Sequence, residues 1–414
     1  SAASDVYKRQ DINNPQLPDF IVPGADEKKQ DEPAKIKVIG VGGGGGNAVN
    51  HMYHQGIGGV SFVLCNTDAQ ALRNSPVPVK VQLGAKGEGA GNIPEVAKKL
   101  AEESAAEVEA LFDDNTRMAF ITAGMGGGTG TGAAPVVARI AKEKGVLTVG
   151  IVTIPFLFEG EPKILQAFAG VEEMRKHVDA LLVINNERLC KIYPDLSWTT
   201  AFAKADDSLS NAARSIAELV SKDGKINLDF ADVRTTLKDG GAAVISTGSG
   251  EGEHRMSRAI QNALTSPLLK ESDIYGAERV LFNLYFSPEE GEKLRMQESK
   301  ELSEFMLRFK KKVNVIWGYT HDSSLGKAVK ITILATGFEV SDLTFKGEYG
   351  GDADEHIAQS QYIVLKPDQL DDNDLLEKLD KTPAYDRPKD FRDNFDGSEK
   401  KEESNGSGRR TIRF

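Results

Sequence analysis

Cysteine and long apolar segments are both scarce in this sequence. Cys65 and Cys190 are the only cysteines among 414 residues. Two are too few for a disulfide framework, which favours a reducing compartment. No apolar run reaches the ~18 residues that a membrane-spanning helix needs, and the first residues lack the basic and apolar segments of a signal peptide. We therefore expect a cytoplasmic protein that does not insert directly into a membrane.

The sequence also lacks an excess of positive charge and a clear metal-binding pattern. The formal net charge is -11, which argues against sequence-independent binding to nucleic acid. The six histidines show no metal-ligand spacing apart from His51 and His54, so we predict no metal site built from side chains. With 40% hydrophobic and 27% charged residues, the composition is that of a soluble protein long enough for two domains.

Glycine, in contrast, is concentrated in two segments. Residues 126–132, Gly-Gly-Gly-Thr-Gly-Thr-Gly, lie between an apolar run at 118–123 and a helix-like run at 133–144. Glycines allow backbone N–H groups to approach an anion closely, and the N-terminus of the following helix favours negative charge. We interpret the segment as a phosphate cradle. The alternative is a flexible Gly/Thr turn, but flexible linkers rarely connect a strand tightly to a helix.

The second segment, residues 40–47, follows the apolar run 36–39 and opens a helix-like run at 48–55. It fits the G-x-G-x-x-G pattern of dinucleotide sites, a weak signal in a glycine-rich stretch. A dinucleotide site needs only one such loop. Two comparable loops therefore favour a nucleotide whose phosphates are held by backbone amides from both sides. The P-loop pattern G-x-x-x-x-G-K-[ST] does not occur in the sequence.

Apolar runs that alternate with helical patterns predict an α/β fold with a mostly parallel sheet. A long amphipathic helix, expected around residues 208–219, would connect the first domain to a second, smaller α/β domain. The expected strands are 36–39, 60–64, 118–123, 147–153, 180–184, 242–247, 279–286, 314–318 and 328–336. The expected segments are a disordered arm at 1–34, a Rossmann-like nucleotide-binding domain at 35–205, a central helix and loop at 206–235, a second domain at 236–340 and a flexible tail at 341–414.

Several further motifs occur in a fixed order along the chain. With the glycine segment at 126–132, they closely resemble the FtsZ family of bacterial, tubulin-like cell-division GTPases. The resemblance covers about residues 36–340 and is most specific at 126–132 and at Asn227–Asp232. The other motifs are Cys65–Gln70, Gly84–Asn92, Phe156–Gly160, Asn185–Asn186, Ala201–Asp207 and Asn227–Val233.

The resemblance implies a tubulin-like fold and a site for GTP or GDP, with Mg²⁺ accompanying the nucleotide. Two segments would hold the phosphates. The first is Gly43, Gly44, Gly45, Gly46 and Asn47, and the second is Gly126, Gly127, Gly128, Thr129, Gly130, Thr131 and Gly132. Ala90, Gly91 and Asn92 would cover the γ-phosphate, and Asp68 would also face the nucleotide. Glu159 and Asn186 would reach the ribose, Phe202 would stack on the base, and Asp206 would read guanine. Lys163 stands where the family commonly has arginine, so it keeps the charge but loses the planar fork.

The resemblance also implies catalysis shared between subunits. Asn227, Asp229 and Asp232 would project onto the nucleotide of the next subunit in a head-to-tail homopolymer at the division site, and would there activate water. The alternative is a purely structural role, in which Asp229 and Asp232 only cap a helix. Membrane-tethering division proteins would dock on the tail, either at residues 382–387 or at 409–414. Two rival functions remain: a polymerising scaffold without hydrolysis, and a dehydrogenase based on residues 40–45.

Overall fold

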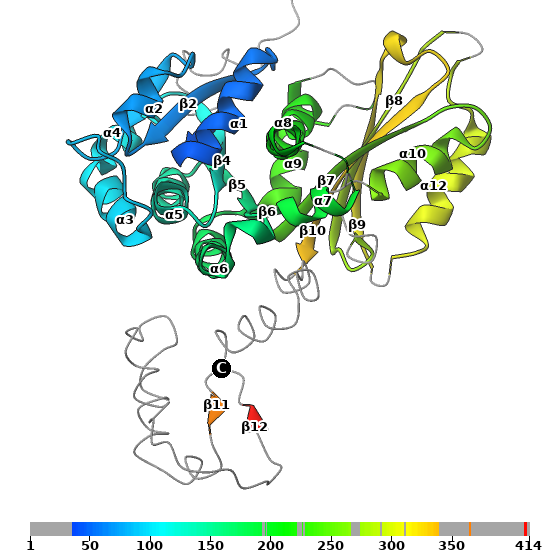
Figure 1. Ribbon diagram of the computed structural model, residues 1–414. Coiled ribbons are helices and arrows are strands. Elements are labelled where there is room, and N and C mark those ends of the chain that lie inside the picture. Colours follow the sequence, from blue (N-terminus) through cyan, green and yellow to red (C-terminus); the bar gives the residue numbers. More distant parts are fainter. Residues whose placement is uncertain are drawn as a thin grey trace, which may run out of the picture.

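The computed structural model describes residues 35–192, 195, 197–221, 226, 228–265, 274–289, 292–309, 312–338, 364–365 and 410–411. The predicted N-terminal arm, most of the predicted tail and Asn227 lie outside the described residues. Two lobes are joined by one sheet of ten strands in the order β3-β2-β1-β4-β5-β6-β7-β10-β8-β9. Helices α8 and α9 lie between the lobes (Figure 1). A separate short pair joins β11 (Val364–Leu365) to β12 (Arg410–Thr411).

The first lobe is a parallel sheet, as its Val- and Ile-rich runs predict. Its strands are β1 (Lys35–Val41), β2 (Val60–Asn66), β3 (Val79–Gln82), β4 (Thr116–Gly124), β5 (Leu147–Ile154) and β6 (Ala180–Asn185). All neighbouring pairs among them run parallel. Every strand predicted here is confirmed. Strand β3 was missed because its sequence, Val-Lys-Val-Gln, is short and half polar.

Helices cover both faces of this sheet. They are α1 (Gly42–His54), α2 (Ala69–Arg73), α3 (Pro94–Glu103), α4 (Ala105–Ala110), α5 (Gly128–Glu143), α6 (Glu161–His177), α7 (Asn186–Ile192), α8 (Trp198–Ser221) and α9 (Phe230–Leu237). Along β1, Ile36 and Val38 enter one core with α1, α8 and α9. Ile39 and Val41 enter the opposite core with α3, α5 and α6. The two cores follow from the alternation of side chains along a strand.

The second lobe continues the same sheet. Strand β7 (Gly241–Gly250) pairs with β6 through two residues only, Gly241 and Ala242. The remaining strands are β8 (Arg279–Phe286), β9 (Asn314–His321) and β10 (Val329–Phe338), which confirms the four strands predicted here. Helices α10 (Arg255–Leu264) and α12 (Ser299–Met306) cover one face. Strand β10 is antiparallel to both of its neighbours, whereas β8 and β9 are parallel.

The predicted long helix exists, but it begins about ten residues earlier than its amphipathic pattern indicates. Helix α8 runs from Trp198 to Ser221. The pattern at 208–219 continues into residues 220 and 221, so the end of the helix agrees with it and only the start differs. Its first turns carry exposed or half-buried residues, including Phe202 at 45% exposure. An exposed helical segment lacks the apolar period by which a helix is recognised in a sequence. Its later apolar residues enter the core that also contains residues of β7, β8 and β10, and α8 therefore packs against both lobes.

Candidate nucleotide site

The two glycine segments meet at the carboxyl edge of the parallel sheet. Helix α1 begins at Gly42, directly after β1, and α5 begins at Gly128, four residues after β4. We predicted loops that precede helices starting at about 48 and 133, and these boundaries are wrong because the glycines themselves form the first helical turns. Strands β1 and β4 are neighbours. Two helix N-termini, each with free backbone N–H groups, therefore lie side by side.

One set of glycines is required by close backbone packing. A Cβ on Gly45 would lie 2.2 Å from the Thr122 carbonyl oxygen, and one on Gly130 would lie 2.3 Å from the Gly124 carbonyl oxygen. A Cβ on Gly132 would lie 2.0 Å from the carbonyl oxygen of Pro94. Such distances leave no room for any side chain. These glycines allow α1 and α5 to pack on the strand ends and on the start of α3.

Three glycines of the two segments, Gly43, Gly46 and Gly127, face open space. A Cβ on Gly43 or Gly46 would meet no atom within 4 Å, and one on Gly127 would meet only Asn92 Oδ1 at 3.9 Å. No packing requirement explains glycine at Gly43 and Gly46. A ligand that approaches the helix backbone would explain it, because a methyl group would stand in its way. The open glycines on α1 and before α5 flank the same strand ends, as a cradle for a phosphate chain requires.

The segment from Ala90 to Ile93 lies over the start of α5. A Cβ on Gly128 would lie 2.8 Å from the Ile93 nitrogen. Gly91 and Asn92 have positive φ angles of 57° and 62°, so the backbone turns sharply here. Asp68 caps α2 by accepting hydrogen bonds from the N–H groups of Gln70 and Ala71 at 2.8 and 3.3 Å. The predicted covering loop is thus next to the phosphate cradle.

Thr67 was not singled out in the sequence, although it belongs to this edge. It is buried, and its hydroxyl lies 2.7 Å from that of Thr129. The contact ties the end of β2 to the first turn of α5. Thr67 lies within the motif Cys65–Gln70, but as an ordinary threonine at a strand end it gives no signal of a role of its own.

An aromatic cluster marks one end of the site. The Phe158 ring stacks on Phe156 with centroids 5.1 Å apart, and Phe202 meets Phe156 edge to face at 5.1 Å. Phe158 is 52% and Phe202 45% exposed, while Phe156 is fully buried. Phe202 is therefore not an ordinary core residue. The two exposed rings give a planar base a surface to stack on.

Asp206 lies one helical turn after Phe202 on α8. Burial raises the pKa of its carboxyl from 3.8 to about 6, and the neighbouring Asp207 adds to the rise while His51 opposes it. Raised carboxyl pKa values are enriched at functional sites, although they also occur elsewhere. Asp206 and Phe202 are one turn apart on α8, and Phe156 and Phe158 contact Phe202. The carboxylate and the exposed rings can therefore contact the same ligand.

Glu159, Lys163 and Asn186 surround the strand ends of β5 and β6. Lys163 Nζ lies 3.3 Å from Glu159 Oε2, and Glu159 Oε1 accepts a hydrogen bond from the Phe156 N–H at 3.0 Å. Asn186 is buried, and its Oδ1 has no hydrogen-bond partner among the described residues. Such an orphaned acceptor is costly unless a ligand or water satisfies it. This observation fits a polar ligand at the predicted position.

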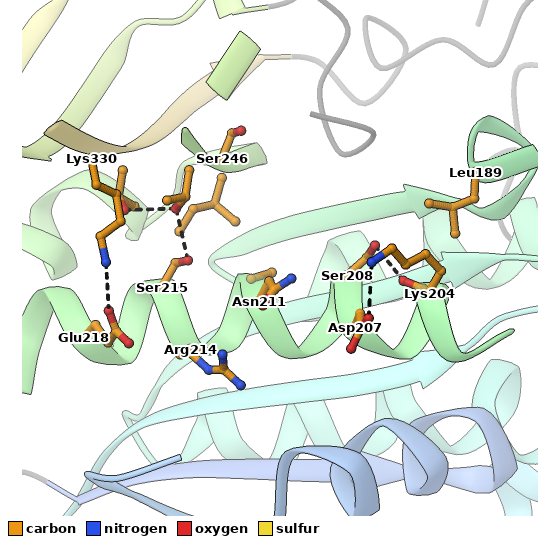
Figure 2. Close-up of a pocket in the computed structure, with 14 residues that line it drawn as sticks. Leu189, Lys204, Asp207, Ser208, Asn211, Arg214, Ser215, Glu218, Ser246 and Lys330 are labelled. Atoms are coloured by element: carbon orange, nitrogen blue, oxygen red, sulfur yellow. Dashed lines mark hydrogen bonds and ion pairs between the residues drawn. The ribbon is translucent and has the colours of Figure 1, made fainter. Parts of the chain in front are cut away.

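Two cavities differ in size and in place. A small one of ≈ 40 Å³ is lined by the first glycine segment, the end of β2 and α2. A larger cleft of ≈ 400 Å³ lies between α8 and strands β7 and β10 (Figure 2). Figure 2 shows Lys330 facing Glu218 across this cleft, with Nζ 3.9 Å from Oε2. The larger cleft does not include the glycine segments, so cavity size and the predicted position of the nucleotide point to different places.

The acidic pair lies near the amino ends of the parallel strands, away from the glycine segments at their carboxyl ends. Asp229 and Asp232 form a reciprocal cap at the start of α9: the Asp232 N–H donates to Asp229 Oδ1 at 2.9 Å, and the Asp229 N–H donates to Asp232 Oδ2 at 3.0 Å. The capping role, which we held open as the alternative, is confirmed. It occupies one oxygen of each carboxylate in these bonds. Asp229 is exposed and Asp232 is half-buried, so a function beyond capping is sterically open.

A cation–π contact shows at which end of β4 the acidic pair lies. The Arg117 guanidinium, at the start of β4, lies 4.5 Å from the centroid of the Phe230 ring, directly after Asp229. The glycine cradle follows Gly124, at the other end of the same strand. Seven residues at ~3.3 Å each separate the two ends by roughly 23 Å. Within one subunit, the acidic pair and the cradle are therefore far apart.

Within the described residues, no cluster of three or more His, Cys, Asp and Glu side chains could hold a metal ion. The helices of the described part include none that is long and apolar enough to cross a bilayer. A Mg²⁺ ion that accompanies a nucleotide takes most of its ligands from phosphate oxygens and water, which is compatible with the first finding.

The comparisons with known proteins cover both lobes. Residues 35–194 match the Tubulin/FtsZ family, GTPase domain, and residues 241–339 match the FtsZ family, C-terminal domain. The chain is 53% identical over 394 residues to the cell division protein FtsZ of Porphyromonas gingivalis (strain ATCC BAA-308 / W83), with 86% of each chain covered. It is 40% identical over 357 residues to that of Buchnera aphidicola subsp. Schizaphis graminum (strain Sg), covering 84% of this chain and 92% of the relative.

Solved structures agree with the sequence relatives. An empty FtsZ dimer from M. jannaschii superposes with a TM-score of 0.68 at 39% identity, covering 78% of this chain and 93% of the other. CetZ2 from Haloferax volcanii, a protofilament with GTPγS bound, gives 0.65 at 21% identity, covering 79% and 99%; this likeness concerns the fold alone. The fold is tubulin-like, as predicted. With two family domains matched and more than half of the residues shared with a relative over most of its length, the chain belongs to the FtsZ family of tubulin-like GTPases.

Proposed function

We propose that this protein binds GTP at the paired glycine helices, hydrolyses it to GDP and phosphate, and polymerises head to tail into filaments of the division ring in the cytoplasm. The observation that carries the proposal is the open backbone at Gly43, Gly46 and Gly127, where packing does not require glycine. Family membership supports the guanine nucleotide as the ligand and self-association as the consequence.

The proposed nucleotide lies along the carboxyl edge of the sheet. Its phosphates contact the N–H groups of α1 and α5, with residues 90–92 as a cover. Glu159 and Asn186 bind the ribose, where Asn186 Oδ1, which lacks a partner among the described residues, accepts a hydrogen bond from a ribose hydroxyl. Lys163 supplies one positive charge close to Glu159. The base stacks on Phe202, and the ionised Asp206 accepts hydrogen bonds from guanine N1–H and N2–H₂, a donor pair that adenine lacks.

The proposed hydrolytic site is shared by two subunits. The separation of roughly 23 Å along β4 keeps Asp229 and Asp232 away from the cradle of their own subunit. A head-to-tail contact would bring the acidic pair of one subunit onto the γ-phosphate of the next, and a contact of this kind that does not close produces filaments. Asn227, Asp229 and Asp232 orient the attacking water. One of the two carboxylates accepts the water proton as the water oxygen bonds to the γ-phosphorus and the bond from that phosphorus to the GDP oxygen breaks. Bound Mg²⁺ would neutralise charge on the phosphate oxygens.

Hydrolysis is therefore expected to depend steeply on protein concentration. Dilute subunits bind GTP but release almost no phosphate, and the specific activity rises above a critical concentration. Phosphate release at saturating GTP, measured alongside sedimentation of polymer, tests this. A specific activity that stays constant into the monomer range contradicts the shared site. Polymer without phosphate release would instead identify a non-hydrolysing scaffold, and bound NAD in place of a guanine nucleotide would support the dehydrogenase.

The raised pKa of Asp206 gives a pH-dependent prediction. Guanine needs the ionised carboxylate, so the affinity of the free protein for GDP should fall about fourfold from pH 7.5 to pH 5.5 when the pKa is about 6. The stability of the nucleotide-free protein should move the other way. Between pH 3.8 and about 6 the folded carboxyl binds more protons than the unfolded one, so this group's contribution to stability rises as pH falls through that window.

Fluorescent GDP titrations and urea unfolding at both pH values measure the two effects. Asp206→Asn is the control: it should weaken binding at neutral pH by about 1–3 kcal/mol and remove most of the pH dependence. A pH profile that is unchanged in Asp206→Asn would show that another group titrates.

The remaining proposals concern the ends of the chain and its division into parts. We propose that residues 35–205 form the GTP-binding domain, 206–235 most of the central helix together with the catalytic loop, and 236–340 the second domain, between an arm at 1–34 and a tail at 341–414. Helix α8 begins at Trp198, so its first turns belong to the GTP-binding domain in this division. In this proposal, membrane-tethering division proteins dock on the tail, at 382–387 or 409–414. Both segments carry aromatic and basic residues beside Thr or Pro.

A further inference from the structure

Strand β9 is the last strand of the sheet and pairs with β8 on one side only. Its other side contacts the chain that leads to the acidic pair. Ile226 forms an antiparallel bridge with Tyr319, and the Tyr319 N–H donates to the Ile226 carbonyl oxygen at 3.1 Å. The segment before Asp229 is thus attached to the second lobe through its backbone.

Gly318 is the residue that permits this attachment. A Cβ at Gly318 would lie 2.7 Å from the Ile226 carbonyl oxygen and 2.7 Å from Leu228 Cγ, with Asn283 Oδ1 at 3.1 Å. Gly318 is buried in the middle of a strand and its φ is not positive. The backbone angles at Gly318 do not require glycine, so its neighbours do: chiefly the loop, at 2.7 Å, and to a smaller extent Asn283, at 3.1 Å.

The rest of the loop is fixed at neighbouring points. Leu228 is buried in the core that α8 and α9 share with both lobes, and Ile316 of β9 packs against that core. Phe230 belongs to the same core and lies under Arg117. The acidic pair therefore follows directly after two anchored residues. A methyl group at Gly318 would displace Ile226 and Leu228 and with them the carboxylates.

We propose that Gly318 on β9 is a positioning residue for the acidic loop, so that the second lobe sets the geometry with which one subunit activates water on its neighbour's GTP. The inference rests on the proposed shared site. Gly318 itself touches no nucleotide. Its role is to admit the backbone of Ile226 and Leu228 at the distance that places Asp229 and Asp232.

Gly318→Ala is expected to bind GTP like the parent protein and to hydrolyse it about tenfold to a hundredfold more slowly, the effect of a displaced catalytic group. Gly58→Ala is the matched control, because a Cβ there would meet no atom within 4 Å and its φ is not positive; its turnover should be unchanged. Parental turnover in Gly318→Ala would overturn the inference and leave the proposed function intact.

Mixing experiments separate a displaced loop from general damage. Gly318→Ala subunits bind GTP but have a displaced acidic loop. Asp206→Asn subunits have an intact acidic loop but bind GTP weakly. A GTP concentration is chosen that fills the nucleotide site of Gly318→Ala but not that of Asp206→Asn. Their mixture should hydrolyse faster than the sum of the two alone, as should a mixture of Asp232→Ala with Asp206→Asn. Gly318→Ala mixed with Asp232→Ala should show no recovery, because both loops are impaired.

Each departure from this pattern has one meaning. No recovery between Asp232→Ala and Asp206→Asn would overturn the shared site and the inference with it. Recovery in that pair, but not between Gly318→Ala and Asp206→Asn, would overturn the inference alone.

A second pair of variants tests the same inference if Gly318→Ala fails to fold. Tyr319→Pro removes the N–H that bonds Ile226, on the side of β9 away from β8, where proline is tolerated. Tyr319→Ala also loses the ring but keeps the N–H. Turnover should be several-fold lower in Tyr319→Pro than in Tyr319→Ala at equal GTP occupancy, and equal turnover would overturn the inference.

Discussion

Asp232→Asn protein is expected to bind GTP as tightly as the parent and to lose nearly all of its hydrolysis. The asparagine keeps an oxygen that can accept from the Asp229 N–H, the bond that Asp232 makes at 3.0 Å, but it removes the negative charge needed to take a proton from water. Loss of a general base lowers a rate by about 10² to 10⁴. Phosphate release at protein concentrations well above the critical value measures the effect.

Asp232→Ala provides the comparison that separates capping from chemistry. Alanine removes the charge and the bond that the Asp232 side chain accepts from the Asp229 N–H, while Asp229 still caps α9. Asp232→Ala should therefore lower stability by about 0.5–1.5 kcal/mol, whereas Asp232→Asn should stay close to the parent in urea unfolding. Both variants should hydrolyse equally poorly. Each should also inhibit parent protein when mixed with it, since every variant subunit disables a neighbour's GTP. If Asp232→Asn retains parental turnover, the carboxylate is only a helix cap.

The sequence was sufficient to predict the sheet but not all of its edges. All nine predicted strands are present, and eight of them are apolar runs that the core buries. Strand β9 is the exception, because most of its residues are exposed or half-buried. Strand β3 and the first turns of α8 were missed, since neither buries enough side chains to leave an apolar period. Fold class and family could be predicted because both glycine segments lie between recognisable strands and helices.

The candidate site could be predicted only as a set of residues. Sequence alone treats all glycines of a segment alike, whereas contacts divide them into those that pack on backbone and those that face open space. Nor could spacing reveal that Arg117 contacts Phe230, or that Gly318 admits the chain at Ile226. These contacts join residues about a hundred positions apart, and no local pattern encodes them.

The division of the glycines predicts opposite effects for two adjacent residues. Gly46→Ala should stabilise the nucleotide-free protein by about 0.5–1 kcal/mol, because Gly46 lies in helix α1 and a methyl group there meets nothing within 4 Å. The same variant should bind GTP at least tenfold more weakly, about 1.4 kcal/mol, since the methyl group occupies the space proposed for phosphate. Thermal unfolding without nucleotide and GDP titration measure the two quantities.

Gly45→Ala should behave in the opposite way towards folding. Its Cβ would lie 2.2 Å from the carbonyl oxygen of Thr122 on β4, and neither backbone can yield without shifting α1 from the sheet. We expect a loss of about 3 kcal/mol or more, seen as a lower urea midpoint or as insoluble protein. If Gly46→Ala kept parental affinity for GDP while Gly45→Ala unfolded, the glycines of α1 would serve helix packing alone. The phosphates would then have to be held by the α5 side of the cradle, where Gly127 is open.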